Sequence, residues 1–361
     1  MGARGAMASS EFERIAWLRA ATARSLRRQS GARGAGRLLC GIGDDAALWA
    51  PPRGQTVVLT VDAQVEGIHF RRTWLTPKQI GARAVVASAS DLAAMGAAPA
   101  GVLFAFTIPH KTSDAYFRRL YRGALQAAHR LKLSVFGGNL TSGPLALTVT
   151  SIGTVRARSA VRRSGARPGD GIFVTGRPGH AALGCALLQA PAPLRSRLVR
   201  GTAGAACVTR FRAPSARIAE AQYLCVRAPI HAMVDVSDGL VADLAHLFES
   251  RAPIGATLHS DRLRTLSVST KILALSRKLG VDPMHCVLHG GENYELLLAA
   301  PIAAMERIAR PFAGRFGVPL TQIGVVKAGR GITLRGATGN GEQPLTPRGF
   351  DHFRNYGSVA R

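Results

Sequence analysis

The sequence predicts an α/β protein, in the wide sense that includes α+β folds, with two domains. Its 361 residues fit one large domain or two of ordinary size, and 47% of them are hydrophobic, which is enough to bury substantial cores. Helical and strand-like patterns are mixed in both halves of the chain, and a cluster of turn-forming residues marks a restart near residue 157.

In the N-terminal half, apolar spacing and turn signals delimit the expected elements. Helices are expected at residues 11–29, 77–95 and 113–131, and strands at residues 56–61, 101–108, 133–136 and 145–155. The apolar run at 56–61 is almost continuous, which is typical of a strand that is buried on both faces.

The C-terminal half begins with the turn-rich stretch 164–170. The expected elements after it are strands at 172–175 and 232–236, and helices at 181–188, at 215–225 and from Gly239 onwards. The Pro-, Arg- and Gly-rich stretch 190–204 is expected to be a surface connection. The resulting division is an extension at 1–10, an N-terminal domain at 11–156 and a C-terminal domain at 157–361.

The formal charge of +26 excludes little by itself. Lysine occurs only six times, and the arginines are dispersed rather than gathered in a stripe or interleaved with aromatic residues, which disfavours nucleic-acid binding as the primary function. The five cysteines form no Cys-x-x-Cys pair, so neither a disulfide framework nor a local zinc site is expected. No apolar run is long enough to span a membrane and no secretory signal is evident, so a cytoplasmic enzyme is expected.

Acidic residues are scarce, yet several stand next to glycines or at the ends of predicted strands. They are Asp44, Asp45, Asp62, Asp91, Asp235 and Asp238. If such carboxylates converge, their mutual repulsion requires a bound cation, and Mg²⁺ prefers these hard oxygen ligands. Each also has a purely structural alternative: Asp44 and Asp45 in a turn, Asp91 or Asp238 at a helix cap. The residue types alone leave both interpretations open.

Eight short motifs are spread in order over nearly the whole chain. They are 41–47 (GIGDDAA), 62–70 (DAQVEGIHF), 90–97 (SDLAAMGA), 137–138 (GG), 163–170 (RSGARPGD), 235–240 (DVSDGL), 290–296 (GGENYEL) and 349–353 (GFDHF). Together they resemble the thiamine-monophosphate kinases, which belong to a superfamily with aminoimidazole ribonucleotide synthetase, selenophosphate synthetase and the hydrogenase-maturation dehydratase. The resemblance implies an N-terminal domain whose sheet pairs with that of a second subunit in a homodimer, and a C-terminal α/β domain.

The resemblance also implies ATP-dependent phosphorylation of thiamine monophosphate to the diphosphate, with Mg²⁺ as cofactor and specific roles for individual residues. The implied metal ligands are Asp44, Thr60, Asp62, Asp91, Asn139, Asp235 and Asp238. Gly138, Asn139, Arg163 and Ser237 are implied nucleotide contacts. His69, Glu292 and Phe350 are implied contacts to the thiamine phosphate. Asp44, Asp238 and Arg163 would be the residues that act in catalysis.

This chemistry suits direct in-line attack by the acceptor phosphate on the γ-phosphorus, because a phosphate oxygen is already ionised near neutral pH and needs no strong base. Positioning and cations would supply most of the catalysis. The chain also has no Gly-x-x-x-x-Gly-Lys-Ser/Thr phosphate-binding loop.

Three positions depart from the family pattern. Asn139 and Asn293 stand where the family commonly has Asp, and Val61 stands where it has a hydroxyl residue. The two Asn residues are expected to cost the metal site and the substrate site one carboxylate each. A catalytically reduced nucleotide-binding paralogue, and a superfamily enzyme with another acceptor, are therefore the alternatives. The first cysteine at Cys40 and the chain end at Arg361 disfavour the selenophosphate and hydrogenase-maturation activities, which would require differently placed cysteines.

Overall fold

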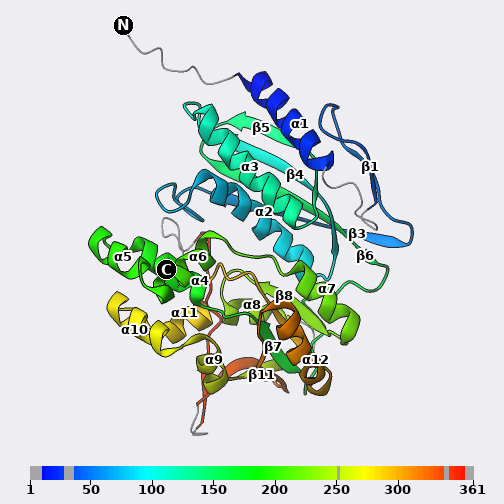
Figure 1. Ribbon diagram of the computed structural model, residues 1–361. Helices are drawn as coiled ribbons and strands as arrows, with labels where there is room; N and C mark the ends of the chain where they lie inside the picture. Colours follow the sequence, from blue (N-terminus) through cyan, green and yellow to red (C-terminus); the bar gives the residue numbers. More distant parts are fainter. Residues whose placement is uncertain (1–9, 28–35, 250–252, 337–340, 354–361) are drawn as a thin grey trace. The chain divides into compact units, whose positions relative to one another are not determined.

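The structure is a computed structural model that describes residues 10–27, 36–249, 253–336 and 341–353 (Figure 1). The extension expected at 1–10 lies, except for Ser10, outside the described residues. The chain forms two compact units: the first runs up to Leu92 and includes Ala98–Ala157, and the second comprises Ala93–Ala97 and the chain from Arg158 onwards. No helix within the described ranges combines the length and the apolar character needed to cross a membrane.

The segment Ala93–Ala97 was expected in the N-terminal domain but packs with the second unit. Val161 N donates to Met95 O at 3.2 Å, and Gln222 Nε2 donates to Ala97 O at 3.4 Å. A boundary predicted from turn chemistry cannot anticipate such a short crossing segment, because these bonds come from residues far along the chain.

The first unit consists of three helices and six strands among the described residues. In chain order they are α1 (Glu11–Arg27), β1 (Arg37–Cys40), β2 (Leu48–Ala50), β3 (Gln55–Val65), α2 (Pro77–Ala94), β4 (Ala98–Ile108), α3 (Asp114–Arg130), β5 (Ser134–Ser142) and β6 (Ala146–Arg156). Ser113 caps α3, because its side chain accepts the N–H of Tyr116. Most expected elements are present; the strand expected at 133–136 continues through the two glycines to Ser142.

The sheet of the first unit has the strand order β3-β6-β4-β5, with only β4 and β5 parallel. Helices α2 and α3 lie over one face of it (Figure 1). Ser88 of α2 donates to Ser151 of β6 at 2.9 Å, and Tyr121 of α3 packs edge-on against Phe104 of β4. The sheet therefore turns alternate residues of every strand toward these helices.

The opposite face of this sheet is largely open, and the prediction that residues 56–61 are buried on both faces is wrong. β3 is an edge strand, and its Leu59 and Val61 are 66% and 61% exposed. Among the described residues, cover is present around Ile152 and Phe136, where Trp49 of the small β1–β2 sheet packs 5.7 Å from Phe136. A continuous apolar run does not distinguish a strand covered on both faces within one chain from a strand with one open apolar face.

The second unit consists of nine helices and seven strands among the described residues. They are β7 (Gly171–Thr175), α4 (His180–Gln189), α5 (Ala192–Val199), α6 (Thr202–Arg212), α7 (Ile218–Arg227), β8 (Ala232–Val236), α8 (Leu240–His246), β9 (Ile254–His259), α9 (Ser260–Ser267), α10 (Thr270–Leu279), α11 (Pro283–His289), β10 (Glu295–Ala300), α12 (Ile302–Phe316), β11 (Leu320–Ala328), β12 (Gly331–Arg335) and β13 (Glu342–Leu345).

These strands form one sheet with the order β13-β12-β9-β11-β7-β10-β8. Residues of α8, α9 and α11 join residues of the sheet in its main core cluster. The stretch 190–204, expected to be a surface connection, is largely exposed, but it is helical: it contains α5 and the start of α6. Pro193 stands in the first turn of α5, where proline is compatible with a helix, so the proline signals mark a helix start there.

Candidate active site

In the first unit, three oxygen-bearing side chains lie on the side of the sheet that the helices cover, two of them on strand β3 and one on helix α2. Thr60 of β3 donates a hydrogen bond from Oγ1 to Asp91 Oδ2 of α2. Asp62 lies two residues along β3 from Thr60 and therefore on the same face. Burial raises the pKa of Asp91, and the bond from Thr60 lowers it. Two carboxylates and a hydroxyl are hard oxygen ligands, so this donor set fits Mg²⁺.

Asp44 and Asp45 lie in the exposed turn between β1 and β2. Asp44 accepts the N–H of Asp45 at 2.9 Å and the thiol of Cys40 at 3.7 Å. These bonds form a local turn, which is the structural role left open for the pair. The turn still presents both carboxylates to solvent, where an ion could approach them.

Asn139 lies at the other edge of the sheet from Asp62. The paired register runs from Ala63 through Thr148 and Ala105 to Asn139, which places Asn139 on the open face, whereas Asp62 faces the helices. Three strand spacings of about 4.8 Å separate β3 from β5 by roughly 14 Å. Within one chain, Asn139 therefore cannot complete the coordination of an ion that Asp62 holds.

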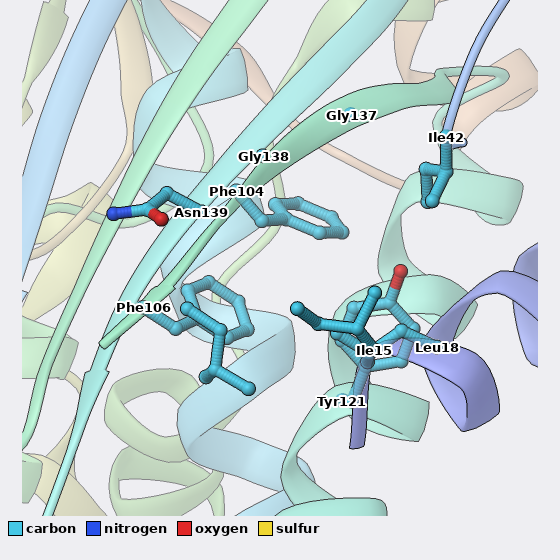
Figure 2. A pocket seen from close by; sticks show the side chains of 10 residues that line it. Ile15, Leu18, Ile42, Phe104, Phe106, Tyr121, Gly137, Gly138 and Asn139 are labelled. Atoms are coloured by element: carbon cyan, nitrogen blue, oxygen red, sulfur yellow. The ribbon is translucent and has the colours of Figure 1, made fainter. Parts of the chain in front are cut away.

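A pocket of about 110 Å³ lies between α1, α3 and the strands β4 and β5. Figure 2 shows the rings of Phe104, Phe106 and Tyr121 around it, with the amide of Asn139 turned away from them. Gly138 lines it at φ +154°, and a Cβ there would come within 2.0 Å of Phe104 O, so only glycine fits. An apolar, ring-lined pocket of this size suits a flat ring.

His69 follows β3 in a short loop of the first unit. Its Nδ1 accepts the backbone N–H of Val65 at 3.0 Å. The neutral ring therefore carries its proton on Nε2, the form that donates a hydrogen bond to an anionic oxygen. Arg72 lies nearby and pairs with Glu66 at 2.6 Å.

In the second unit, the structure brings Asp238, Glu292 and Phe350 together from three separate segments. Phe350 N donates to Asp238 O at 3.1 Å. Burial, and next the charge of Glu292, raise the pKa of Asp238, whereas His352 and His246 lower it. Asp235 is buried in the adjoining strand β8. The predicted metal ligand Asp238 thus lies beside two of the predicted substrate contacts.

The loop 290–294 is tied to the loop that carries Ser237. Glu292 N donates to Ser237 O at 2.7 Å, and Tyr294 N donates to Val236 O at 2.8 Å. Glu292 and Tyr294 both have positive φ angles, of 64° and 51°, which non-glycine residues rarely adopt. Tyr294 Oη donates to Glu292 Oε2 at 2.7 Å, so Tyr294 orients that carboxylate.

Asn293 does not cost the substrate site a carboxylate, and that expectation is wrong. The side chain is buried: its Oδ1 accepts the N–H of Gly179 at 2.9 Å, and its Nδ2 donates to Gly290 O at 2.7 Å and Gly291 O at 3.3 Å. An ionised Asp could not donate the last two bonds. Asn293 therefore holds the loop of Glu292 instead of facing a ligand.

Arg163 is 59% exposed and lies 3.5 Å from the exposed carboxylate of Glu249. Such a pair is weak, so a nucleotide phosphate could displace Glu249.

Three residues near these loops were not predicted as site residues from the sequence. They are Tyr294, His352 and Asp243. Burial and the charge of Asp238 raise the pKa of Asp243 to about 7, while N–H bonds from Gly239 and Asp238 lower it. Within the described ranges, His, Cys, Asp and Glu side chains do not gather in groups of three or more that could hold a metal ion. Each unit instead offers a smaller oxygen set.

Comparison with known proteins identifies the family. Residues 43–155 match the model of the AIR synthase related protein, N-terminal domain. The thiamine-monophosphate kinase of Escherichia coli strain K12 is 36% identical over 320 residues, which are 87% of this chain and 91% of that protein.

Two solved structures are also similar. The thiamine-monophosphate kinase of Stenotrophomonas maltophilia K279a has a TM-score of 0.73 and 31% identity, and the match covers 86% of this chain and 94% of that one. AaThiL in complex with AMPPCP and TMP has a TM-score of 0.69 and 29% identity, covering 95% and 97%. The chain belongs to the thiamine-monophosphate kinase family.

Proposed function

We propose that the chain transfers the γ-phosphoryl group of ATP to the phosphate of thiamine monophosphate and releases thiamine diphosphate. The main support is the likeness, over 95% of the chain, to a structure that holds AMPPCP and TMP. The assembly of Asp238, Glu292 and Phe350 in the second unit supports it independently, because a carboxylate there adjoins groups suited to a cationic aromatic substrate.

Magnesium ions are bound by oxygen side chains in each unit. Thr60, Asp62 and Asp91 hold them in the first unit, with Asp44 and Asn139 as further ligands, and Asp235 and Asp238 hold them in the second. When bound, these ions neutralise charge on both phosphate-bearing reactants, which otherwise repel each other.

The remaining residues bind and orient the two substrates. His69 donates from Nε2 to a substrate phosphate oxygen. Glu292, held by Tyr294, and the ring of Phe350 contact the thiamine part. Gly138 and the adjoining ring-lined pocket are nucleotide contacts of the first unit, and Ser237 and Arg163 are nucleotide contacts of the second. Because the acceptor oxygen is already ionised, no residue has to act as a strong general base.

The reaction is tested by incubating the purified protein with ATP, Mg²⁺ and thiamine monophosphate. We expect thiamine diphosphate and ADP to form in equal amounts, with thiamine diphosphate separated chromatographically. Unphosphorylated thiamine serves as the control acceptor. ATP binding without any thiamine diphosphate would favour a catalytically reduced paralogue, and product from another phosphorylated acceptor alone would favour a different superfamily activity.

The chain also forms a homodimer through the open face of the first unit's sheet. Leu59 and Val61 expose an apolar surface there that a monomer would leave in water. Asn139 lies on the same face, so dimerisation would place it against a second copy. This gives Asn139 a position from which it can serve the reaction despite its distance from Asp62 in its own chain.

Replacing Leu59 with glutamate should convert the dimer into a monomer, because a carboxylate would be buried on an apolar interface. Light scattering after size exclusion should give twice the 38.1 kDa chain mass for the unmodified protein and a single chain mass for the variant. Val226→Glu is the matched control, since Val226 of α7 is 81% exposed and lies in the other unit. A monomeric unmodified protein, or a dimeric Leu59→Glu variant, would refute this interface.

A further inference from the structure

Asp243 of α8 binds the backbone of the loop that carries Ser237 and Asp238. One oxygen, Oδ2, accepts the N–H groups of Ser237, Asp238 and Gly239 at 3.0, 3.1 and 3.1 Å. Asp243 is only 2% exposed. These three amides lie between the end of β8 and the start of α8, so neither element supplies partners for them in the usual way.

Consecutive N–H groups that point to one spot form a concave nest, an arrangement that commonly binds phosphate. In this loop the anion in the nest is the chain's own carboxylate. A nucleotide phosphate therefore cannot use these three N–H groups without displacing Asp243. The loop can still contact phosphate through the Ser237 hydroxyl and through cations on the neighbouring carboxylates.

We propose that Asp243 is a positioning residue. It holds loop 235–239 in place through three backbone N–H groups, so that the loop binds phosphate through metal ions and not through those N–H groups. The inference rests on the proposed function for the identity of the substrates, but the hydrogen bonds that carry it do not. Because Glu292 N donates to Ser237 O and Phe350 N donates to Asp238 O, a shift of this loop would also move the substrate contacts.

The acceptor oxygens of Asp243 matter as well as the volume of its side chain. A carboxylate oxygen can accept several N–H bonds and binds them more strongly than a neutral acceptor. The amide of an asparagine has the same volume, but half of its polar end is a donor. Asp243→Asn would therefore leave the loop with weaker or fewer bonds and no cavity beneath it.

The unmodified protein supplies the first test. Residue-resolved amide hydrogen exchange should show Ser237, Asp238 and Gly239 protected in the absence of nucleotide, with protection changing less than about twofold when Mg²⁺ and ATP are added. Free exchange of these amides, followed by protection only when nucleotide is bound, would show that phosphate fills the nest and would overturn the proposal. This result does not depend on any turnover of thiamine monophosphate.

The second test compares Asp243→Asn with Asp282→Asn. Asp282 is the exposed N-cap of α11 and accepts Met284 N at 2.9 Å, a role that asparagine fills equally well. Mn²⁺ alone is the probe, and its binding is measured by electron paramagnetic resonance. We expect Asp243→Asn to weaken Mn²⁺ binding by about 10- to 100-fold, the usual effect of a residue that supports a metal ligand.

A purely structural role predicts a different outcome. If Asp243 only stabilised the fold, the variant would melt at a lower temperature while its folded fraction kept normal Mn²⁺ affinity, kcat and KM; that pattern would refute the proposal. We expect kcat to fall and the Mg²⁺ requirement to rise in Asp243→Asn, with Asp282→Asn unchanged. If Asp243→Asn does not fold, hydrogen exchange in the unmodified protein decides the question.

Discussion

Replacing Asp238 with asparagine should lower kcat by about 100- to 1,000-fold, the range observed when one group that stabilises transition-state charge is removed. The fold should survive. Burial and the charge of Glu292 both raise the pKa of Asp238, which means that ionising this carboxyl costs more free energy in the folded chain than in the unfolded chain. Asparagine removes that repulsion, so the melting temperature should stay the same or rise.

Steady-state kinetics and thermal melting together check this prediction. Asp261→Asn is the control, because Asp261 is an exposed residue in the first turn of α9 in the same unit. Lost activity with preserved or increased stability is the pattern expected of a functional carboxylate. Activity within a few-fold of the unmodified enzyme would remove Asp238 from the metal-binding set.

The largest effect on stability is expected at Arg217. Its guanidinium donates from Nε to Glu295 Oε2 at 2.7 Å and from Nη2 to Glu295 Oε1 at 2.6 Å, with both side chains buried. Thr175 donates to the same carboxylate at 2.8 Å. Arg217→Leu would leave the buried Glu295 with only the partly exposed Arg210, whose Nη1 lies 3.7 Å from Glu295 Oε1, at a cost of about 3–5 kcal/mol in the free energy of unfolding.

Urea denaturation measures this cost, and two further variants interpret it. Arg335→Leu breaks an ion pair with Glu342 in which both side chains are partly exposed, and should cost at most about 1 kcal/mol. The double variant Arg217→Leu, Glu295→Met should be more stable than Arg217→Leu alone, because the buried carboxylate of Glu295 is gone, although Glu220 still loses its bond to Arg217. A single-variant cost below that of Arg335→Leu would contradict the interpretation.

Glu295 begins the strand directly after Tyr294, so the pair also bears on the site. The Arg217–Glu295 bond, the amide of Asn293 and the bond from Tyr294 N to Val236 O fix the chain after Glu292, while Glu292 N is itself held by Ser237 O. The strained backbone at Glu292 persists because its neighbours are held in this way.

Local patterns predicted most helices and strands, because the periodicity of apolar residues is a property of short segments. They failed where an element depends on its surroundings. The apolar run of β3 does not reveal that its outer face is open, and the prolines near α5 resemble a loop unless their place in the first turn is known. The matched family, and the two-domain α/β fold that it implies, are confirmed.

The site was predictable only through the ordered motifs. Asp238, Glu292 and Phe350 are far apart in the chain, and nothing in their local sequence requires that they meet. The sequence indicates Asp243 only weakly. It is an acidic residue in the first turn of a predicted helix that follows a glycine, and many ordinary helices have an acidic residue there. The inward orientation of the Asn293 side chain could not be predicted from the sequence, because it depends on carbonyl groups that come together only in the folded turn.

In the proposed homodimer, the open apolar face of β3 links folding to protein concentration. A surface that is stable only when a second copy covers it makes association part of the folding equilibrium, so stability becomes a function of how much protein is present. Dilution would then weaken the first unit before any residue of the active site changed. In a cell, the rate of synthesis would set the fraction of chains that are assembled, and through it the fraction able to work.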